Sequence, residues 1–171
     1  GVCKRGYLPA AVALRVLRAG DASRDLGDML SALVVQFCFI FFSRGHTALA
    51  LLDADVTLSA DGASLVVTAF SHKGKSAAES ALVPPQIFPT AGVPELPRLL
   101  RRFRSARGRV GQSPGSYLLS LDFSRPFAAD IQGWFCKGLL LPGVPRPPAN
   151  ISWTSHSGRH GGAESGDAFQ Q

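Results

Sequence analysis

Cysteine, acidic residues and long apolar runs are all scarce in this sequence. The three cysteines, Cys3, Cys38 and Cys136, are far apart and form no Cys-x-x-Cys pair. Neither a disulfide framework nor a zinc ribbon is therefore indicated, and we expect reduced, buried thiols. The longest apolar run, residues 29–42, has 14 residues and contains Gln36, whereas a helix that crosses a bilayer needs about 20. We expect a buried helix there and no membrane partner.

Basic residues outnumber acidic ones. The sequence has 18 Lys and Arg and 12 Asp and Glu, which gives a net charge of +6 and a pI near 9.8. A cationic surplus attracts polyanions, of which nucleic acid is the commonest. Six arginines and no acid lie in RLLRRFRSARGR, residues 98–109. Such a tract suits phosphate groups, and its simpler interpretation is a solvated helix face.

The first half of the chain predicts two helices followed by short strands. At 171 residues, the chain can bury one sizeable core, so one domain is the default. Apolar residues at helical spacing between Pro9 and Gly20 predict a first helix ahead of the buried one. The turn pair Asp61-Gly62 predicts two short strands within residues 56–70, and a further strand is expected near 79–83.

The second half alternates connectors with helices. Residues 84–97 are proline-rich and predict a connector, after which 96–106 can form an arginine-rich helix. A further helix is expected at 125–140, followed by irregular chain at 141–150, where prolines remove backbone donors. The apolar stripe expected on the 125–140 helix consists of Phe127, Ile131, Phe135 and Leu139.

Three motifs then stand out for their order along the chain. FFSRGHTALALLDADVTL contains Arg44 ahead of leucines and a strand, and LVVTAFSHKGK ends in a basic turn. HSGRHGGA, residues 156–163, is a His-x-x-Arg pattern directly after Ser155, which is placed to cap a helix. In this order the motifs resemble the catalytic domain of tyrosine recombinases, the phage-integrase-like enzymes, and especially their eukaryotic mobile-element members. The resemblance covers roughly residues 25–171.

The resemblance implies an α+β fold, in which a mainly helical catalytic domain carries a small antiparallel sheet or hairpin, as in DNA breaking-rejoining enzymes. Residues 1–24 would be an N-terminal remnant or linker helix, and 25–171 the catalytic domain, incomplete at its C-terminal end. The implied activity is DNA recombination and integration by phosphotyrosine strand transfer. No cofactor is implied, because the covalent linkage to tyrosine keeps the bond energy.

The resemblance also implies roles for four residues. Arg44 and Arg159 would clamp the scissile phosphate, because guanidinium is permanently charged and donates in a planar fork. His156 would hydrogen-bond the phosphate and assist proton transfer. Lys73 would protonate the leaving 5′ oxygen, and Lys75 in the same turn is the alternative.

Two departures from the family pattern bear on activity. The acid usually found three residues after the first arginine is replaced by Thr47. The nucleophilic tyrosine normally follows the His-x-x-Arg helix, but Tyr7 and Tyr117, the only tyrosines, both precede His156. We therefore expect no nucleophile in this chain and no strand cleavage by the chain alone. An intact partner subunit could supply one in trans.

The expected partner is double-stranded DNA, in an intracellular setting (the nucleus, if the source is eukaryotic), with homo-oligomer formation on DNA possible and no small-molecule substrate.

His156 and His160, with Glu164, invite a zinc hypothesis, but Ser157 replaces the glutamate of an HExxH motif, so no metal is expected. The alternative function is a non-catalytic basic DNA-binding or interaction module derived from a mobile element. Within the tract 98–109, the DNA-binding candidates are Arg101, Arg102 and Arg104.

Overall fold

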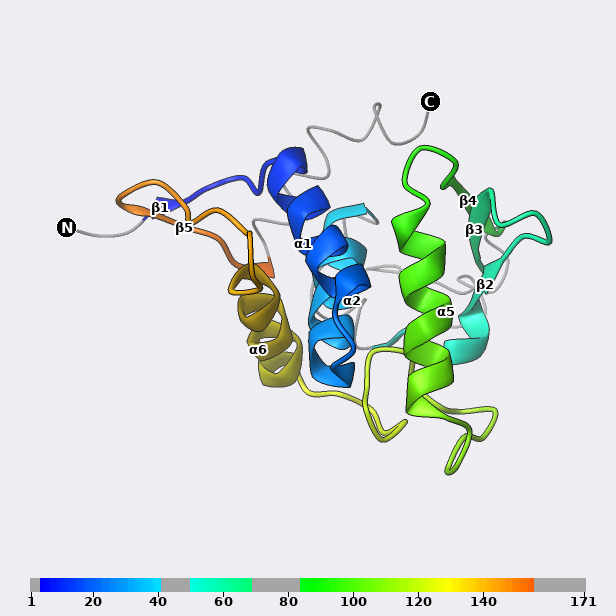
Figure 1. Ribbon diagram of the computed structural model, residues 1–171. Coiled ribbons are helices and arrows are strands. Elements are labelled where there is room, and N and C mark those ends of the chain that lie inside the picture. The colour runs from blue at the N-terminus through cyan, green and yellow to red at the C-terminus, as the bar shows by residue number, and fades with distance from the viewer. Residues whose placement is uncertain (1–3, 41–49, 69–83, 156–171) are drawn as a thin grey trace.

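The computed structural model describes residues 4–40, 50–68 and 84–155, which form an α+β fold of helices with a small antiparallel sheet at one side (Figure 1). The α+β class expected from the sequence is thereby confirmed. In chain order the described elements are β1 (Lys4–Arg5), α1 (Ala10–Ala22), α2 (Leu26–Ile40), the 3-10 helix η1 (Asp53–Asp55), β2 (Val56–Leu58), β3 (Ser64–Val67), β4 (Gln86–Pro89), α5 (Glu95–Arg107), α6 (Ala128–Leu139) and β5 (Ile151–Ser152).

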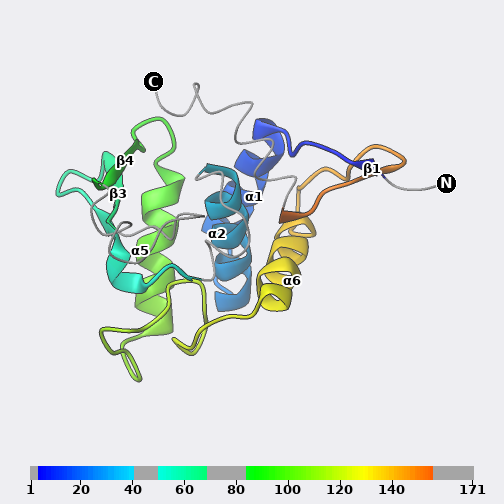
Figure 2. The same cartoon turned by 180° about the vertical axis from the view of Figure 1, so that it is seen from behind.

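Helix α2 lies at the centre of the helices, with α6 on one side and α5 on the other in both opposite views (Figures 1 and 2). Residues 29–39 are all buried, which confirms the expected buried helix as far as it is described. The one amide in this run, Gln36, donates from Nε2 to the carbonyl of Ala13 at 2.8 Å, so burial leaves it paired. Among the described residues no helix is both long and apolar enough to span a membrane.

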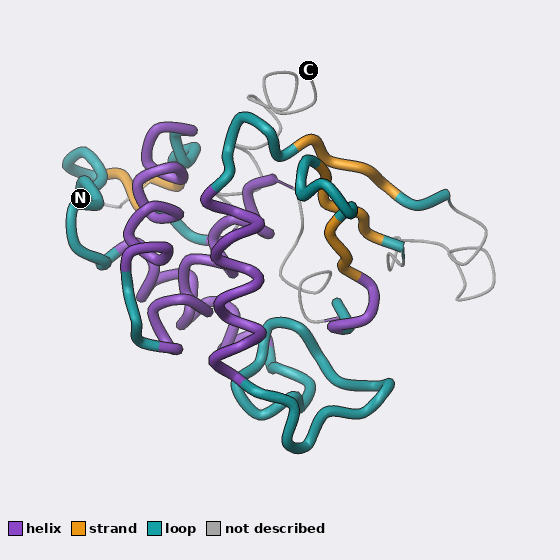
Figure 3. The backbone as a smooth tube through the Cα atoms, turned by 45° about the vertical axis from the view of Figure 1, so that its right-hand side comes forward, coloured by secondary structure: helices purple, strands orange, loops and turns teal. Residues whose placement is uncertain are grey.

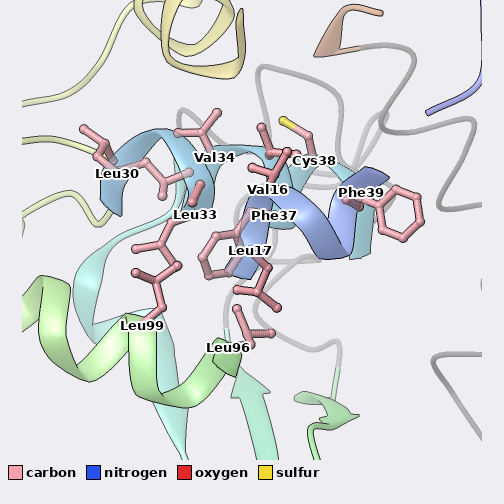
Figure 4. Close-up of a cluster of buried hydrophobic side chains, with 14 of the residues drawn as sticks. Val16, Leu17, Leu30, Leu33, Val34, Phe37, Cys38, Phe39, Leu96 and Leu99 are labelled. Atoms are coloured by element: carbon pink, nitrogen blue, oxygen red, sulfur yellow. The ribbon is translucent and has the colours of Figure 1, made fainter. Parts of the chain in front are cut away.

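Small residues let the neighbouring helices approach α2 closely. A Cβ on Gly20 of α1 would lie 2.2 Å from Cβ of Ala32, and one on Gly138 of α6 would lie 2.9 Å from the carbonyl oxygen of Ser31. Leucines of α5 complete the packing, since Leu96 and Leu99 face Leu33, Phe37 and Leu17 (Figure 4). A continuous apolar core therefore joins α1, α2 and α5.

Helix α1 belongs to this same core, because Val16 and Leu17 are fully buried in it. At the N-terminal end of the described chain, β1 pairs in parallel with β5, with Lys4 opposite Ile151. The expected boundary after residue 24 therefore does not coincide with a break in the core.

The sheet has the strand order β2-β3-β4, with both pairings antiparallel. Gly62 in the β2–β3 turn has a φ of 71°, a conformation that glycine adopts without strain; the hairpin expected at Asp61-Gly62 is confirmed. Val56, Leu65, Val67 and Phe88 are the buried side chains of the sheet.

Strand β4 corrects the expectation that residues 84–97 form only a connector. Gln86–Pro89 pairs along the whole of β3, because β4 is an edge strand, where a proline that cannot donate a hydrogen bond is tolerated. The other prolines of this stretch lie in connecting segments, except Pro97, which is accommodated in the first turn of α5. The strand expected at 79–83 lies outside the described residues.

The apolar stripe expected on α6 is only partly correct. Ile131 and Phe135 are buried, and Leu139 packs half-buried against the core. Phe127, however, is 77% exposed, because α6 begins at Ala128 and Phe127 is the extended residue in front of it. A side chain outside the helix does not follow the helical stripe.

The expectation of buried thiols is correct for Cys38 and wrong for Cys136. Cys38 lies inside α2, and burial raises the pKa of its thiol to about 12. Cys136 is exposed, because it follows Phe135 and so lies on the solvent side of α6. Cys3 lies outside the described residues.

Candidate nucleic-acid interface

The arginine-rich tract forms helix α5, as expected for residues 96–106, and combines an apolar face with an arginine face. Glu95 lies in its first turn, and Arg104 and Arg107 lie in its last, the arrangement that favours the helix dipole. The helix ends at Gly108, whose φ of 75° and ψ of −169° belong to a region that is essentially restricted to glycine. The buried residues of α5 are Leu96, Pro97, Leu99, Leu100 and Phe103.

At the N-terminal end of α5, two arginines converge on Asp21 of α1. Arg98 donates from Nε to both carboxylate oxygens, at 3.0 and 2.9 Å. Arg102 donates from Nη1 to the backbone carbonyl of Asp21 and from Nη2 to that of Ser23, the latter at 2.6 Å. These contacts, which we call the Asp21 cluster, attach α5 to the end of α1.

At the C-terminal end, Arg104 and Arg107 share Asp53 of η1. Arg104 donates from Nε to Oδ1 of Asp53 at 3.0 Å, and from Nη2 to the carbonyl of Val56 at 2.6 Å. Arg107 donates from Nη2 to the same Oδ1 at 2.9 Å, while Gln112 donates to Oδ2 at 2.9 Å. One carboxylate thus accepts from three side chains, and we call this group the Asp53 cluster.

Arg107 is the most deeply buried of these arginines, with a side chain only 2% exposed. Its guanidinium carbon lies 4.8 Å from the ring centre of Phe103 and 4.3 Å from that of Phe123. Burial lowers the pKa of Arg107, and the charge of Asp53 opposes this shift. Its Nη1 donates to three carbonyls, those of Tyr117, Leu118 and Ser120, at 3.0, 2.8 and 2.8 Å. Arg107 therefore holds the connection between α5 and α6 (Figure 3) against the helix.

Beside the Asp53 cluster lie two open, adjoining hollows, which we treat as one and call the arginine hollow. Their volumes are about 410 and 320 Å³. Of the described residues, four arginines and one aspartate line them. Arg101 and Arg109 are exposed, and the guanidinium group of neither has a hydrogen-bond or ion-pair partner among the described residues. The lining residues are Asp53, Arg101, Arg104, Ser105, Arg107, Gly108, Arg109 and Gln112.

The three DNA-binding candidates have different surroundings. Arg101 lines the arginine hollow, and its guanidinium meets no acceptor in the part of the chain that the structure describes. Arg104 lines it too, although its donors are directed to Asp53 and Val56. Arg102 is engaged in the Asp21 cluster. Arg101 is therefore the candidate whose charge is most available to a ligand.

The catalytic candidates Arg44, Lys73, His156 and Arg159, together with the alternative Lys75, lie outside the described residues. The structure consequently neither assembles nor separates them. What it does show is where the described chain meets the segments that carry them.

Two of these segments join the described chain beside η1. The segment with Arg44 ends at Ala50, three residues before Asp53. The segment with Lys73 starts after Thr68, whose N–H donates to the carbonyl of Asp55 at 2.8 Å. Both junctions therefore flank the 3-10 helix that carries the Asp53 cluster.

The segment with His156 and Arg159 starts elsewhere. It follows Ser155, whose N–H donates to Oε1 of Gln132 on α6 at 3.2 Å. Among the described residues, no three or more His, Cys, Asp or Glu side chains gather as they would around a metal ion.

Sequence reasoning did not select Asp53, Arg107, Arg109 or Gln112 as site residues. Both arginines belong to the tract 98–109, but nothing local indicates that one is buried and the other free. No protein-family model matches the chain, and no curated protein matches its sequence. The fold and the arginine hollow together define an α+β protein with a cationic site suited to phosphate-bearing ligands.

Proposed function

We propose that this chain is a DNA-binding domain of a tyrosine recombinase or integrase, which acts in DNA recombination and integration by phosphotyrosine strand transfer but does not itself supply the tyrosine. One observation carries the proposal: the segments with Arg44 and Lys73 both join the described chain beside η1. The adjoining hollow is cationic, as a surface facing DNA must be. The order of the elements, with helices ahead of a small antiparallel sheet and further helices, also agrees with the resemblance.

The spacing along the chain is compatible with the proposed roles. Arg44 precedes Ala50 by six residues and Lys73 follows Thr68 by five. Since an extended chain spans at most about 3.5 Å per residue, each side chain can reach a phosphate within roughly 20 Å of η1. Arg44 and Arg159 would stabilise the charge on the non-bridging oxygens. Lys73, or alternatively Lys75, would protonate the leaving oxygen, with His156 assisting.

DNA binding by the purified chain tests the proposal most directly. A fluorescently labelled duplex is titrated by anisotropy at several salt concentrations. We expect log affinity to fall linearly with log salt, by about 0.9 per phosphate neutralised. Arg44→Ala and Arg159→Ala should each weaken binding and lower this slope by about one. Arg15→Ala removes the same charge from the exposed face of α1 and should leave the slope unchanged.

A nicked suicide DNA substrate provides the second arm of this test. The chain alone should form no covalent protein–DNA adduct, because no tyrosine follows His156 in it. An adduct would overturn the expected lack of a nucleophile, and absent or salt-independent DNA binding would overturn the proposed function.

A non-catalytic basic DNA-binding module is the second candidate, and it is favoured by the guanidinium groups of Arg101 and Arg109, which have no partner among the described residues. The same titrations separate the two candidates. DNA binding that survives Arg44→Ala and Arg159→Ala with an unchanged salt slope supports the module and counts against the recombinase site.

A further inference from the structure

We propose that the arginine hollow holds the phosphodiester backbone of double-stranded DNA through Arg101 and Arg109, as a site separate from the residues proposed for strand transfer. The inference rests on the proposed function only in taking DNA as the polyanion. The sequence selected Arg101, Arg102 and Arg104 as DNA-binding candidates. The present proposal keeps Arg101 from that set and adds Arg109.

The first argument is the availability of donors. Arg104 and Arg107 donate to Asp53 and to backbone carbonyls, so neither can turn to a ligand without leaving a buried acceptor unpaired. Arg102 is held in the same way by Asp21 and Ser23. Arg101 and Arg109 are exposed, and their guanidinium groups have no acceptor among the described residues. They are the pair that can turn to a phosphate at no structural cost.

The second argument is charge. Around the hollow, Arg101, Arg104, Arg107 and Arg109 face one carboxylate within the described ranges, that of Asp53. Both burial and the nearby charge of Arg104 lower the pKa of Arg107, against the effect of Asp53. Like charges in one hollow repel each other, and a bound phosphate diester reduces that repulsion.

The third argument is preorganisation. Arg109 lies in a tight turn in which the N–H of Gln112 donates to its carbonyl at 3.0 Å. The side chain of Gln112 is in turn fixed to Asp53. Gly108 presents no Cβ at the rim, and Ser105 adds a hydroxyl to the same hollow. Because hydrogen bonds already fix the backbone around this site, little conformational entropy is lost when a phosphate binds.

The lining also argues for a backbone rather than another phosphate-bearing or acidic partner. Among the described residues, no aromatic or aliphatic side chain lines the hollow, so a nucleotide base finds no apolar surface there. A protein partner would find no apolar or aromatic anchor, of the kind that interface centres carry. Guanidinium and hydroxyl donors to phosphate oxygens position a duplex without reading its sequence.

The double variant Arg101→Ala/Arg109→Ala tests the proposal in the anisotropy titration. Its matched control is Arg15→Ala/Arg18→Ala, which removes two exposed arginines from α1. At about 0.1 M salt we expect the hollow variant to bind duplex DNA at least ~10-fold more weakly, with the salt slope reduced by about two. The control should lose less than about twofold, and urea unfolding should show both variants to be folded.

Three results would overturn the proposal: unchanged binding in the hollow variant, an equal loss in both variants, or a fluorescent ATP analogue that binds the hollow more tightly than duplex DNA. The Arg44→Ala and Arg159→Ala titrations keep the two proposals apart. If only Arg44→Ala and Arg159→Ala weaken DNA binding, the arginine hollow does not bind DNA and the proposed function stands. If only Arg101→Ala/Arg109→Ala weakens binding, the arginine hollow binds DNA and the proposed strand-transfer site does not.

Discussion

The two ends of α5 are attached by the same chemistry in different surroundings. In the Asp21 cluster, the side chains of Arg98 and Arg102 are 53% and 33% exposed, whereas those of Arg104 and Arg107 in the Asp53 cluster are 27% and 2% exposed. The two carboxylates are similarly shielded, at 12% exposed for Asp21 and 14% for Asp53, so the difference lies in the arginines: water reaches the side chain of Arg98 but hardly that of Arg107. The comparison indicates that the end of α5 beside the arginine hollow is the one whose ion pairs matter to the fold.

The Asp53 cluster also joins more of the chain than the Asp21 cluster does. Through Arg104 it ties α5 to η1 and β2, and through Arg107 to the connection that leads to α6. Phe123 in this connection has a φ of 68°, a strained backbone for a non-glycine residue. Its ring packs on Arg107, so the stacking offsets part of that strain.

Replacing the aspartate of each cluster should give the largest difference in stability between the two ends of α5. Asp53→Ala leaves the buried charge of Arg107 without a counter-ion, so we expect a loss of about 3 kcal/mol in the free energy of unfolding. Asp21→Ala leaves Arg98 and Arg102, whose side chains are 53% and 33% exposed, within reach of water, and should cost less than about 1 kcal/mol. Urea denaturation of the two variants at pH 7 measures both values.

Asp53→Asn is the matched control, since it keeps one oxygen acceptor of similar shape while it removes the charge and replaces the second oxygen with an amide donor. It should be less destabilising than Asp53→Ala. A loss for Asp21→Ala as large as that for Asp53→Ala would contradict the distinction between the two ends of α5.

The elements were predictable where the pattern is local, and the arginine contacts were not. A largely apolar run predicted α2, and a turn pair predicted the hairpin at Asp61-Gly62. The partners of the arginines, however, lie far away in the sequence: Asp21 is 77 residues from Arg98, and Asp53 is 54 from Arg107. Sequence reasoning therefore identified the basic tract but could not separate structural arginines from free ones.

Two of the errors have similar causes. Strand β4 forms in a proline-rich stretch because β3 offers it a complete pairing edge, which no local pattern reveals. Phe127 was placed on the stripe of α6 because the start of the helix, at Ala128, was set three residues too early. For the catalytic candidates, the segments at 41–49, 69–83 and 156–171 lie outside the described residues, so the predicted roles remain predictions.

The stability costs of Asp21→Ala and Asp53→Ala should also respond differently to salt, and this effect is smaller than the difference between the two costs themselves. At 1 M salt the Debye length is about 3 Å, so exposed ion pairs are largely screened and partly buried ones much less so. The small cost of Asp21→Ala should therefore approach zero between 0.05 and 1 M NaCl, while the cost of Asp53→Ala should persist. Thermal unfolding of both variants and the parent chain across this range measures the difference. An Asp53→Ala cost that disappears with salt would show that this pair is solvated as well.

The smallest effect concerns Asp122, an aspartate that supports the Asp53 cluster indirectly. Its Oδ1 accepts from the hydroxyl of Ser120 at 2.9 Å and from the N–H of Ser124 at 3.1 Å, and the carbonyl of Ser120 accepts from Arg107. The hydroxyl of Ser124, followed by that of Ser120 and the N–H of Ser124, donates to Asp122 and lowers its pKa from 3.8 to about 2. Because the pKa is lowered on folding, the ionised group stabilises the fold above about pH 3.8, and this contribution is lost as the pH falls to about 2.

Asp122→Asn isolates this contribution from the other carboxylates that titrate in the same range. The parent chain should unfold at a higher temperature than the variant at pH 5 to 6, and the gap should close as the pH falls from about 4 to about 2. Melting temperatures of both chains at half-unit pH steps measure the gap. A gap that stays constant down to pH 2 would mean that the negative charge is not what holds this turn.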